Sequence, residues 1–129
     1  MKLSLDTNAY SRLATHQAGI LSCVNEAETI YLSNIMLGEL FAGFYLGKRE
    51  RENRLELAAF LDLPDVSAIP VDAAIADRYG FLVKTLRSQG TPIPTNDIWI
   101  AATAFETGSR LVTYDTHFKH IPGLIIIAP

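Results

Sequence analysis

Four acidic residues border segments rich in apolar residues, where an isolated carboxylate is difficult to explain structurally. They are Asp6, Glu39, Asp97 and Asp115. A buried carboxylate without a partner costs several kcal/mol or takes up a proton, so a positive group is expected beside these side chains. If the four carboxylates converge from separate elements, they predict a binding site for a divalent metal ion.

Taken one at a time, three of the acids have ordinary structural alternatives. Asp6 and Asp115 each stand in a sequence typical of turns and helix caps, and Asp97 can interact with the dipole of a helix that begins beside it. Glu39 differs, because it is the only charged residue between positions 34 and 47 and has no partner nearby in the sequence. A common location for all four acids favours a shared metal site over coincidence.

The nature of these side chains also limits which metal is expected. Ligand sets made only of oxygen favour Mg²⁺ or Mn²⁺ over Zn²⁺, which prefers cysteine and histidine. His16, His117 and His120 show no zinc-binding spacing and Cys23 stands alone, so these residues are predicted to lie on the surface or to serve packing. The number of metal ions is left open.

Apolar patterns along the chain predict strands that alternate with helices. Strands are predicted at residues 2–6, 29–32, 66–71, 111–114 and 124–127. Helices are predicted at residues 7–14, 18–26, 49–63 and 73–88, the last with Asp72 as cap and Gly90 after its end. A further long helix follows its cap Ser33, and another is opened by Asp97 and terminated by Gly108. This order predicts an α/β fold with a mostly parallel central sheet and helices on both faces. The four acids would meet beyond the carboxyl ends of its strands.

Length and composition limit the other possibilities. A chain of 129 residues that is 49% hydrophobic is expected to form one domain, residues 1–129. A single cysteine excludes an internal disulfide, and neither a signal-peptide pattern nor an apolar run of about 20 residues is present, so a cytoplasmic location away from membranes is expected. The net charge of −3 does not exclude a nucleic-acid partner, because the four candidate ligands alone carry more negative charge than this.

With these residues in view, the chain resembles the PIN-domain ribonucleases and, more closely, the VapC-like toxins of toxin-antitoxin pairs. The resemblance covers nearly the whole chain and depends on four ordered motifs. These are Leu5-Asp6-Thr7-Asn8; Ser33 with Gly38-Glu39-Leu40 and Gly43; Asn96-Asp97 with Ile100-Ala101-Ala102; and the run from Leu111 to Asp115 with Phe118. It implies an endoribonuclease, the toxin of a type II pair, that hydrolyses RNA phosphodiester bonds with water activated by Mg²⁺ or Mn²⁺.

The resemblance also implies roles for individual residues. Asp6, Glu39, Asp97 and Asp115 would form the catalytic and metal-binding set, with Asp6 and Asp97 as the most direct ligands. Glu39 would bind directly or through water, and Asp115 would hold an outer position or a second metal ion. Supporting contacts to the acids are expected from Thr7, Asn8, Ser33, Asn96 and Thr113.

RNA contacts are expected from basic residues outside the acidic set. The candidates are Arg12, Lys48, Arg49 and Arg110, together with Lys2, Arg51 and Arg54. The group at 48–54 is interleaved with glutamates, which favours a solvated helix with ion pairs over a phosphate-binding track. Trp99, Tyr45 and Tyr114 can stack on bases, although packing in the core is the more common role of such aromatic residues.

Two kinds of protein partner follow from the resemblance: a small cognate antitoxin that covers the active site, and a second copy of the chain in a homodimer. The apolar helix that carries Leu40, Phe41, Phe44 and Tyr45 can bind the antitoxin, or the same residues can pack in the core of the domain. Two alternative functions remain, a metal-dependent phosphohydrolase outside the toxin class and a non-catalytic module that binds a partner on the same fold. A phosphate-binding loop of the GxxxxGK[ST] type is absent, and Asp6-Thr7-Asn8 lacks the second acid of haloacid-dehalogenase-like phosphatases.

Overall fold

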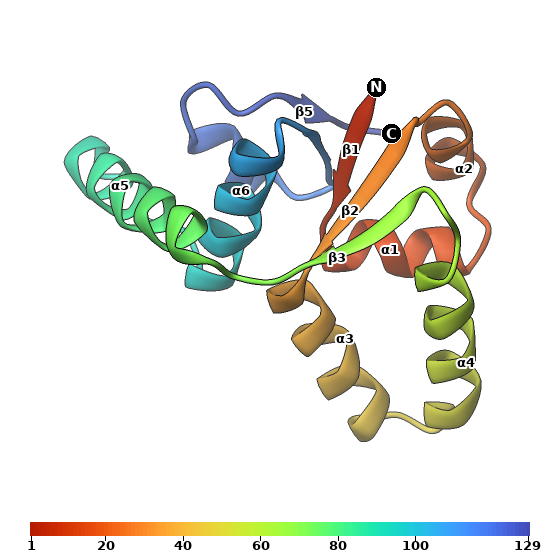
Figure 1. Ribbon diagram of the computed structural model, residues 1–129. Helices are drawn as coiled ribbons and strands as arrows, with labels where there is room; N and C mark the ends of the chain where they lie inside the picture. Colours follow the sequence, from red (N-terminus) through yellow and green to blue (C-terminus); the bar gives the residue numbers. More distant parts are fainter.

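A computed structural model describes residues 1–129 as alternating strands and helices around one parallel sheet (Figure 1). The strands are β1 (Lys2–Leu5), β2 (Thr29–Ser33), β3 (Val66–Ile69), β4 (Arg110–Val112) and β5 (Ile126–Ile127). The helices are α1 (Thr7–Ala14), α2 (Ala18–Asn25), α3 (Asn34–Leu46), α4 (Glu50–Leu61), α5 (Ala73–Gln89) and α6 (Thr95–Thr107), with a short 3₁₀ helix η1 (Thr116–His120). The predicted α/β class and parallel sheet are confirmed.

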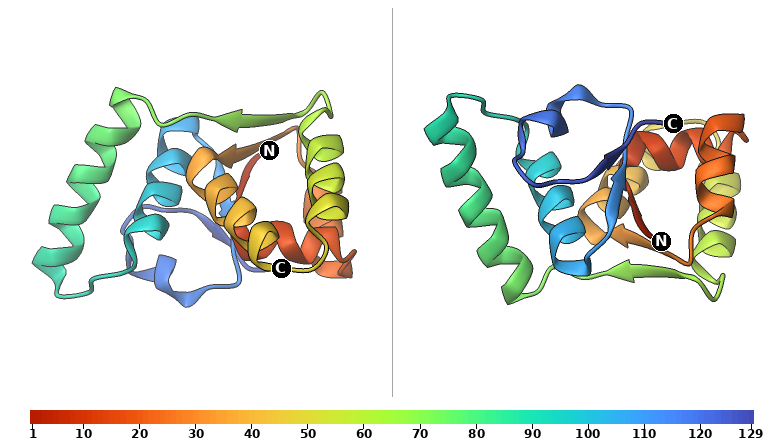
Figure 2. Two further views of the ribbon diagram at one scale, coloured as in Figure 1. Left: turned by 90° about the horizontal axis from the view of Figure 1, so that it is seen from below. Right: turned by 90° about the horizontal axis from the view of Figure 1, so that it is seen from above.

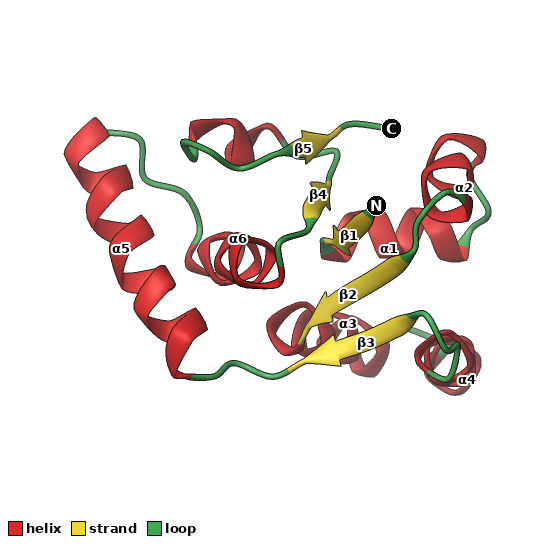
Figure 3. Ribbon diagram, turned by 45° about the horizontal axis from the view of Figure 1, so that its top comes forward, coloured by secondary structure: helices red, strands yellow, loops and turns green.

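The sheet has the strand order β3-β2-β1-β4-β5, and every neighbouring pair is parallel. All strands therefore direct their carboxyl ends to one edge, where α1 and α3 begin (Figure 1). Helices α5 and α6 lie on one side of the sheet, and α1, α2 and α4 lie on the other (Figure 3). Figure 2 shows α5 as the outermost helix on its side.

Helix ends follow the capping residues expected from the sequence. The side chain of Ser33 accepts a hydrogen bond from the backbone N–H of Ile35 at the start of α3, and Asp72 accepts one from Ile75 at the start of α5. Gly90 and Gly108 end α5 and α6 with φ of 73° and 65°, a left-handed conformation that glycine adopts without steric cost.

Several predicted boundaries were too long. Strand β1 ends at Leu5, before Asp6, which caps α1 although its backbone N–H still donates to Val112, and β4 ends at Val112, before the turn that carries Asp115. Strand β5 comprises two residues only, and α4 ends at Leu61. The sheet is thus shorter than expected at the edge where the acids lie.

A single cluster of apolar side chains from both faces of the sheet forms the core. Leu3, Leu5, Leu32, Leu111 and Val112 are the strand residues that are almost fully buried in it. Leu40 and Phe44 of α3 are also buried, so of the two roles considered for this helix the core role is confirmed for these two residues. Of the large apolar residues of α3, only Tyr45 and Leu46, at its end, expose most of their surface. No helix combines the length and apolar character needed to cross a membrane.

Candidate metal centre

Asp6 directly follows β1 and is the most deeply buried of the four acids, with 5% of its surface exposed. Its Oδ1 accepts a hydrogen bond of 2.8 Å from the backbone N–H of Ala9, which makes Asp6 the N-cap of α1. Its Oδ2 accepts a hydrogen bond from the hydroxyl of Thr113. Each carboxylate oxygen has two lone pairs, so both oxygens can still bind a cation while accepting these bonds.

Asp115 lies in the turn after β4 and has a structural role of its own. Its Oδ1 accepts a hydrogen bond of 2.8 Å from the backbone N–H of His117, which makes Asp115 the N-cap of η1. Its own backbone N–H donates to the hydroxyl oxygen of Thr113 at 2.9 Å. Asp115 is therefore a turn residue that also holds a carboxylate at the edge of the sheet.

Glu39 is half-buried in the second turn of α3, and its partner comes from a different helix. The hydroxyl of Thr7, in the first turn of α1, donates a hydrogen bond of 2.6 Å to Oε1 of Glu39. This bond orients the side chain and leaves Oε2 without a recorded hydrogen bond. The sequence offered no local partner for Glu39 because Thr7 is 32 residues away.

Asp97 lies in the first turn of α6, where the helix dipole favours a negative charge. Its Oδ2 is 3.2 Å from Nδ1 of His117, and the same nitrogen is 3.2 Å from Oδ1 of Asp115. No lysine or arginine lies within ion-pair distance of Asp6, Glu39, Asp97 or Asp115, and the half-exposed His117 is the one basic side chain within that distance, of Asp97 and Asp115.

The pKa values of two of the acids are raised, mainly by burial and further by the neighbouring negative charges. Burial raises the pKa of Asp6, and the charges of Asp115 and Glu39 raise it further, against the lowering effect of the bonds from Thr113 and Ala9. Burial also raises the pKa of Asp97, the hydrogen bond from His117 lowers it, and the charges of Asp115 and Glu39 raise it. Asp115 and Glu39 thus lie within electrostatic range of both Asp6 and Asp97. A divalent cation would reverse these shifts by compensating the charge.

The donor set fits a hard cation. Four carboxylates converge, two of them partly desolvated, with no lysine or arginine to neutralise them. Asp97, Asp115 and His117 offer donor atoms that all lie within 4.8 Å of one another. The role of Asp6, Glu39, Asp97 and Asp115 as metal ligands stays a prediction that this geometry supports.

The five residues expected to support the acids divide into two groups. Thr7 and Thr113 donate hydrogen bonds to Glu39 and Asp6. Ser33 is buried and caps α3, Asn8 accepts a long bond of 3.4 Å from Arg12, and Asn96 is exposed with no recorded side-chain bond. The structure therefore brings two of the five into contact with the acids.

Of the basic residues considered for RNA contact, Arg12 packs against Tyr114, the residue that precedes Asp115. Its guanidinium group lies over the ring of Tyr114, 4.0 Å from the centroid, beside Asp115. Arg110 begins β4 and Lys2 begins β1, so both stand at the amino ends of the strands, at the opposite edge from the acids. The structure does not bring these two residues to the site.

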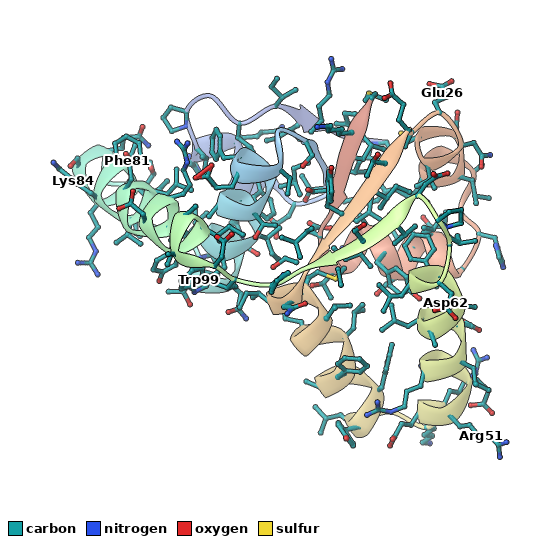
Figure 4. The ribbon with its side chains drawn as sticks, in the orientation of Figure 1. Glu26, Arg51, Asp62, Phe81, Lys84 and Trp99 are labelled. Carbon is teal, nitrogen blue, oxygen red and sulfur yellow. The ribbon has the colours of Figure 1, made fainter.

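The basic group at 48–54 lies at the outer ends of α3 and α4. Arg54 pairs with Glu50 at 3.0 Å and Arg49 approaches Glu56 at 3.9 Å, as expected for a solvated helix with ion pairs. Arg51 is at the end of α4 that is remote from the sheet (Figure 4). Trp99 stacks on Tyr79 between α6 and α5, with centroids 3.8 Å apart, so the expected packing role of this residue is confirmed (Figure 4).

His117 is the residue of this site that the sequence did not reveal, because it was predicted to be a surface or packing residue. The side chain is half-exposed, but Nδ1 faces two of the acids. Its partner Asp97 is 20 residues away, on a different element. The only signal in the sequence was the spacing Asp115-Thr116-His117, which places a histidine two residues after a candidate ligand.

Comparison with known proteins identifies the family. Residues 4–124 match the family model of the PIN domain. The chain is 35% identical over 136 residues to the VapC ribonuclease Y4jK of Sinorhizobium fredii, across 97% of this chain and 95% of the relative. It is 34% identical over 107 residues to ribonuclease VapC2 of Rickettsia felis, across 82% and 78% of the two chains. In the solved structure of VapBC2 from Rickettsia felis bound to a promoter DNA fragment, one chain matches with a TM-score of 0.85 and 30% identity over 98% of both chains. The chain therefore belongs to the PIN domain family.

Proposed function

We propose that this protein is a divalent-metal-dependent endoribonuclease that acts as the toxin of a type II toxin-antitoxin pair. The observation that carries the proposal is the convergence of four carboxylates at one edge of the sheet without a lysine or arginine partner. Relatives that match over most of their length are named VapC ribonucleases, which supports RNA as the substrate. Residues 1–129 would form one PIN domain in the cytoplasm.

Asp6 and Asp97 would bind Mg²⁺ or Mn²⁺ most directly, with Glu39 as a direct or water-mediated ligand and Asp115 in an outer position or at a second ion. When bound, such an ion supplies a water of lowered pKa and stabilises the negative charge that develops on the phosphate oxygens. The carboxylates hold the cation and do not attack the phosphate.

Hydrogen bonds from neighbouring groups orient the carboxylates of Asp6 and Glu39 for metal binding. The backbone N–H of Ala9 and the hydroxyl of Thr113 fix the two oxygens of Asp6, and the hydroxyl of Thr7 fixes Oε1 of Glu39. Side chains that are locked in this way lose little further entropy when they bind an ion or orient a substrate. Arg12, beside the acidic edge, is positioned to receive a phosphate of the RNA strand.

The antitoxin would bind beside the α3 surface considered first, on a group of helices that includes two neighbours of α3, α1 and α4. Helices α1, α2 and α4 enclose an apolar pocket of about 460 Å³. Its walls include Tyr10, Leu13, Leu21, Val24, Ala59 and Phe60. The solved VapBC relatives are complexes, which supports a protein partner, and a pocket of this composition suits the apolar side chains of an antitoxin segment. A homodimer of the toxin is also part of the proposal.

Cleavage of structured RNA by the purified protein, freed of antitoxin, tests the catalytic proposal. Mg²⁺ or Mn²⁺ should support cleavage and a chelator should stop it. Asp6→Asn and Asp97→Asn should abolish cleavage, whereas Asp72→Asn should not, because Asp72 caps α5 away from the site and asparagine caps helices equally well. Equal cleavage by wild type and the first two variants would indicate a contaminating nuclease and overturn the proposal.

A pair of matched substitutions tests the antitoxin surface. Leu21→Glu places a charge in the apolar pocket, and Leu46→Glu places the same charge at the exposed end of α3. Binding of the cognate antitoxin, measured by calorimetry, should weaken strongly for Leu21→Glu and change little for Leu46→Glu. A larger loss of affinity for Leu46→Glu than for Leu21→Glu would indicate that the antitoxin binds the surface of α3.

A further inference from the structure

His117 is held in a defined position relative to two of the candidate ligands. Its backbone N–H donates to Oδ1 of Asp115 at 2.8 Å, which anchors the start of η1, and η1 packs against α6, the helix that carries Asp97. From this position Nδ1 lies 3.2 Å from an oxygen of Asp97 and 3.2 Å from an oxygen of Asp115. The other ring nitrogen has no recorded partner within the chain.

These separations match those between neighbouring ligands of one metal ion. In an octahedral site with bonds of about 2.1 Å, adjacent donor atoms lie about 3 Å apart, since the edge of an octahedron is √2 times the bond length. Nδ1 of His117 meets this spacing with both carboxylates at once. A neutral imidazole nitrogen is, moreover, a common metal ligand in proteins.

We propose that Nδ1 of His117 is a ligand of a metal ion to which Asp97 and Asp115 both bind, so that Asp115 is a direct ligand and not in an outer position, and that this nitrogen donor biases the site toward Mn²⁺ over Mg²⁺. This inference rests on the proposed metal centre and goes beyond it, because the centre as expected from the sequence contains oxygen ligands only. Both ions bind well to oxygen ligands, but Mn²⁺ is a transition-metal ion of the Irving–Williams series and so gains more from an added nitrogen donor than the harder Mg²⁺ does.

Electron spin echo spectroscopy of the Mn²⁺-loaded protein tests the ligand directly. A nitrogen bound to Mn²⁺ gives a hyperfine coupling to ¹⁴N, and labelling of the histidines with ¹⁵N must change it. The coupling should be present in wild type, absent in His117→Ala and retained in His120→Ala. His120 is the matched control, because it lies in the same 3₁₀ helix and is exposed.

Calorimetric titration with each metal supplies a second readout that does not depend on catalysis. Removal of the imidazole in His117→Ala should weaken Mn²⁺ binding by about tenfold or more, with a much smaller effect on Mg²⁺. His117→Asn places an amide oxygen near the position of Nδ1, so it should recover affinity without recovering the preference for Mn²⁺. Circular dichroism of each metal-free variant establishes that it is folded.

Results that contradict the role of His117 differ from results that contradict the metal centre itself. Mn²⁺ binding by wild type without a nitrogen coupling would overturn the role of His117 and leave the four-carboxylate centre intact. An unchanged Mn²⁺-to-Mg²⁺ affinity ratio in a folded His117→Ala variant would do the same. Absence of any Mn²⁺ or Mg²⁺ binding by wild type would overturn the metal centre itself, and the proposed catalytic function with it.

Discussion

The hydroxyl of Thr113 donates a hydrogen bond to Oδ2 of Asp6, a residue 107 positions earlier in the chain. The same hydroxyl oxygen accepts the backbone N–H of Asp115 at 2.9 Å. The side chains of Thr113 and Asp6 are both buried. One hydroxyl group thus links the carboxyl ends of β1 and β4 and couples the orientation of the most buried acid to the turn that carries Asp115.

Replacement of Thr113 by valine removes this hydroxyl but keeps a branched side chain of similar volume. Asp6 then loses a donor while it stays buried, and a hydrogen bond to a charged group is worth about 1.5–3 kcal/mol. We expect the free energy of unfolding to fall by about that amount. We also expect affinity for Mn²⁺ to fall by about 10- to 100-fold, the usual cost of losing a contact that orients a metal ligand. Urea unfolding and calorimetric titration measure the two effects.

Thr113→Ser provides the control, since serine keeps the hydroxyl and removes only the methyl group. Its metal affinity should stay close to that of wild type. A Thr113→Val variant that binds Mn²⁺ as tightly as wild type would mean that the hydroxyl does not orient Asp6 for metal binding.

The elevated pKa of Asp6 predicts how stability depends on pH in the metal-free protein. Burial, with the charges of Asp115 and Glu39, raises this pKa above its ordinary value of 3.8, so the folded state holds the proton to higher pH than the unfolded chain does. The contribution of Asp6 to stability therefore falls as pH rises from 3.8 to the elevated pKa and stays low above it. Asp6→Asn keeps the helix cap and removes this cost.

Metal-free Asp6→Asn should accordingly be more stable than wild type near neutral pH, and the difference should disappear below pH 3.8. Thermal or urea unfolding across this range measures it. Addition of Mn²⁺ should make wild type more stable than Asp6→Asn. At a concentration of 100 times its Kd, a bound ion stabilises wild type by about 2.7 kcal/mol, and the variant lacks one ligand for it. A variant less stable than wild type at neutral pH without metal would contradict the proposed origin of the shift.

Arg12 and Arg110 form a matched pair for testing where RNA binds. Arg12 lies over the ring of Tyr114 at the acidic edge, and Arg110 begins β4 at the opposite edge. Arg12→Ala should weaken RNA binding and reduce the slope of log affinity against log salt by about 1, as expected for one lost phosphate contact. Arg110→Ala should change neither. Titration of a labelled RNA with the catalytically inactive Asp97→Asn protein at several salt concentrations gives both quantities. Equal effects of the two substitutions would place RNA elsewhere.

Local signals in the sequence were sufficient for the elements and for most of the helix ends. Ser33, Asp72, Gly90 and Gly108 each act through their immediate neighbours, so their caps could be predicted without knowledge of the tertiary structure. The alternation of strands and helices then fixed the parallel sheet, and with it the common edge of the four acids. The strand ends were less predictable, because Asp6 and Thr113 still donate backbone hydrogen bonds to neighbouring strands while their side chains bond to each other across the sheet.

Contacts between distant elements were the part that sequence alone did not reveal. The pairing of Thr7 with Glu39 and that of His117 with Asp97 each join two helices that only the assembled fold brings together. The buried positions of Leu40 and Phe44 have the same origin, since α3 is apolar on more than one face and its periodicity does not show which face meets the core.

The stacked pair of Trp99 and Tyr79 predicts a contribution to stability that is separable from the metal site. Their ring centroids are 3.8 Å apart with an angle of 11° between the planes, and the contact fastens α5 to α6. A double-mutant cycle with Trp99→Leu and Tyr79→Leu should give a coupling free energy of about 0.5–1.5 kcal/mol, measured by urea unfolding followed by circular dichroism. Metal affinity should hold in Trp99→Leu, because Asp97 is positioned by the first turn of α6 and by His117 and not by this pair. A coupling energy near zero would mean that the stack adds nothing beyond burial, and a large loss of metal affinity would mean that α5 helps to position Asp97.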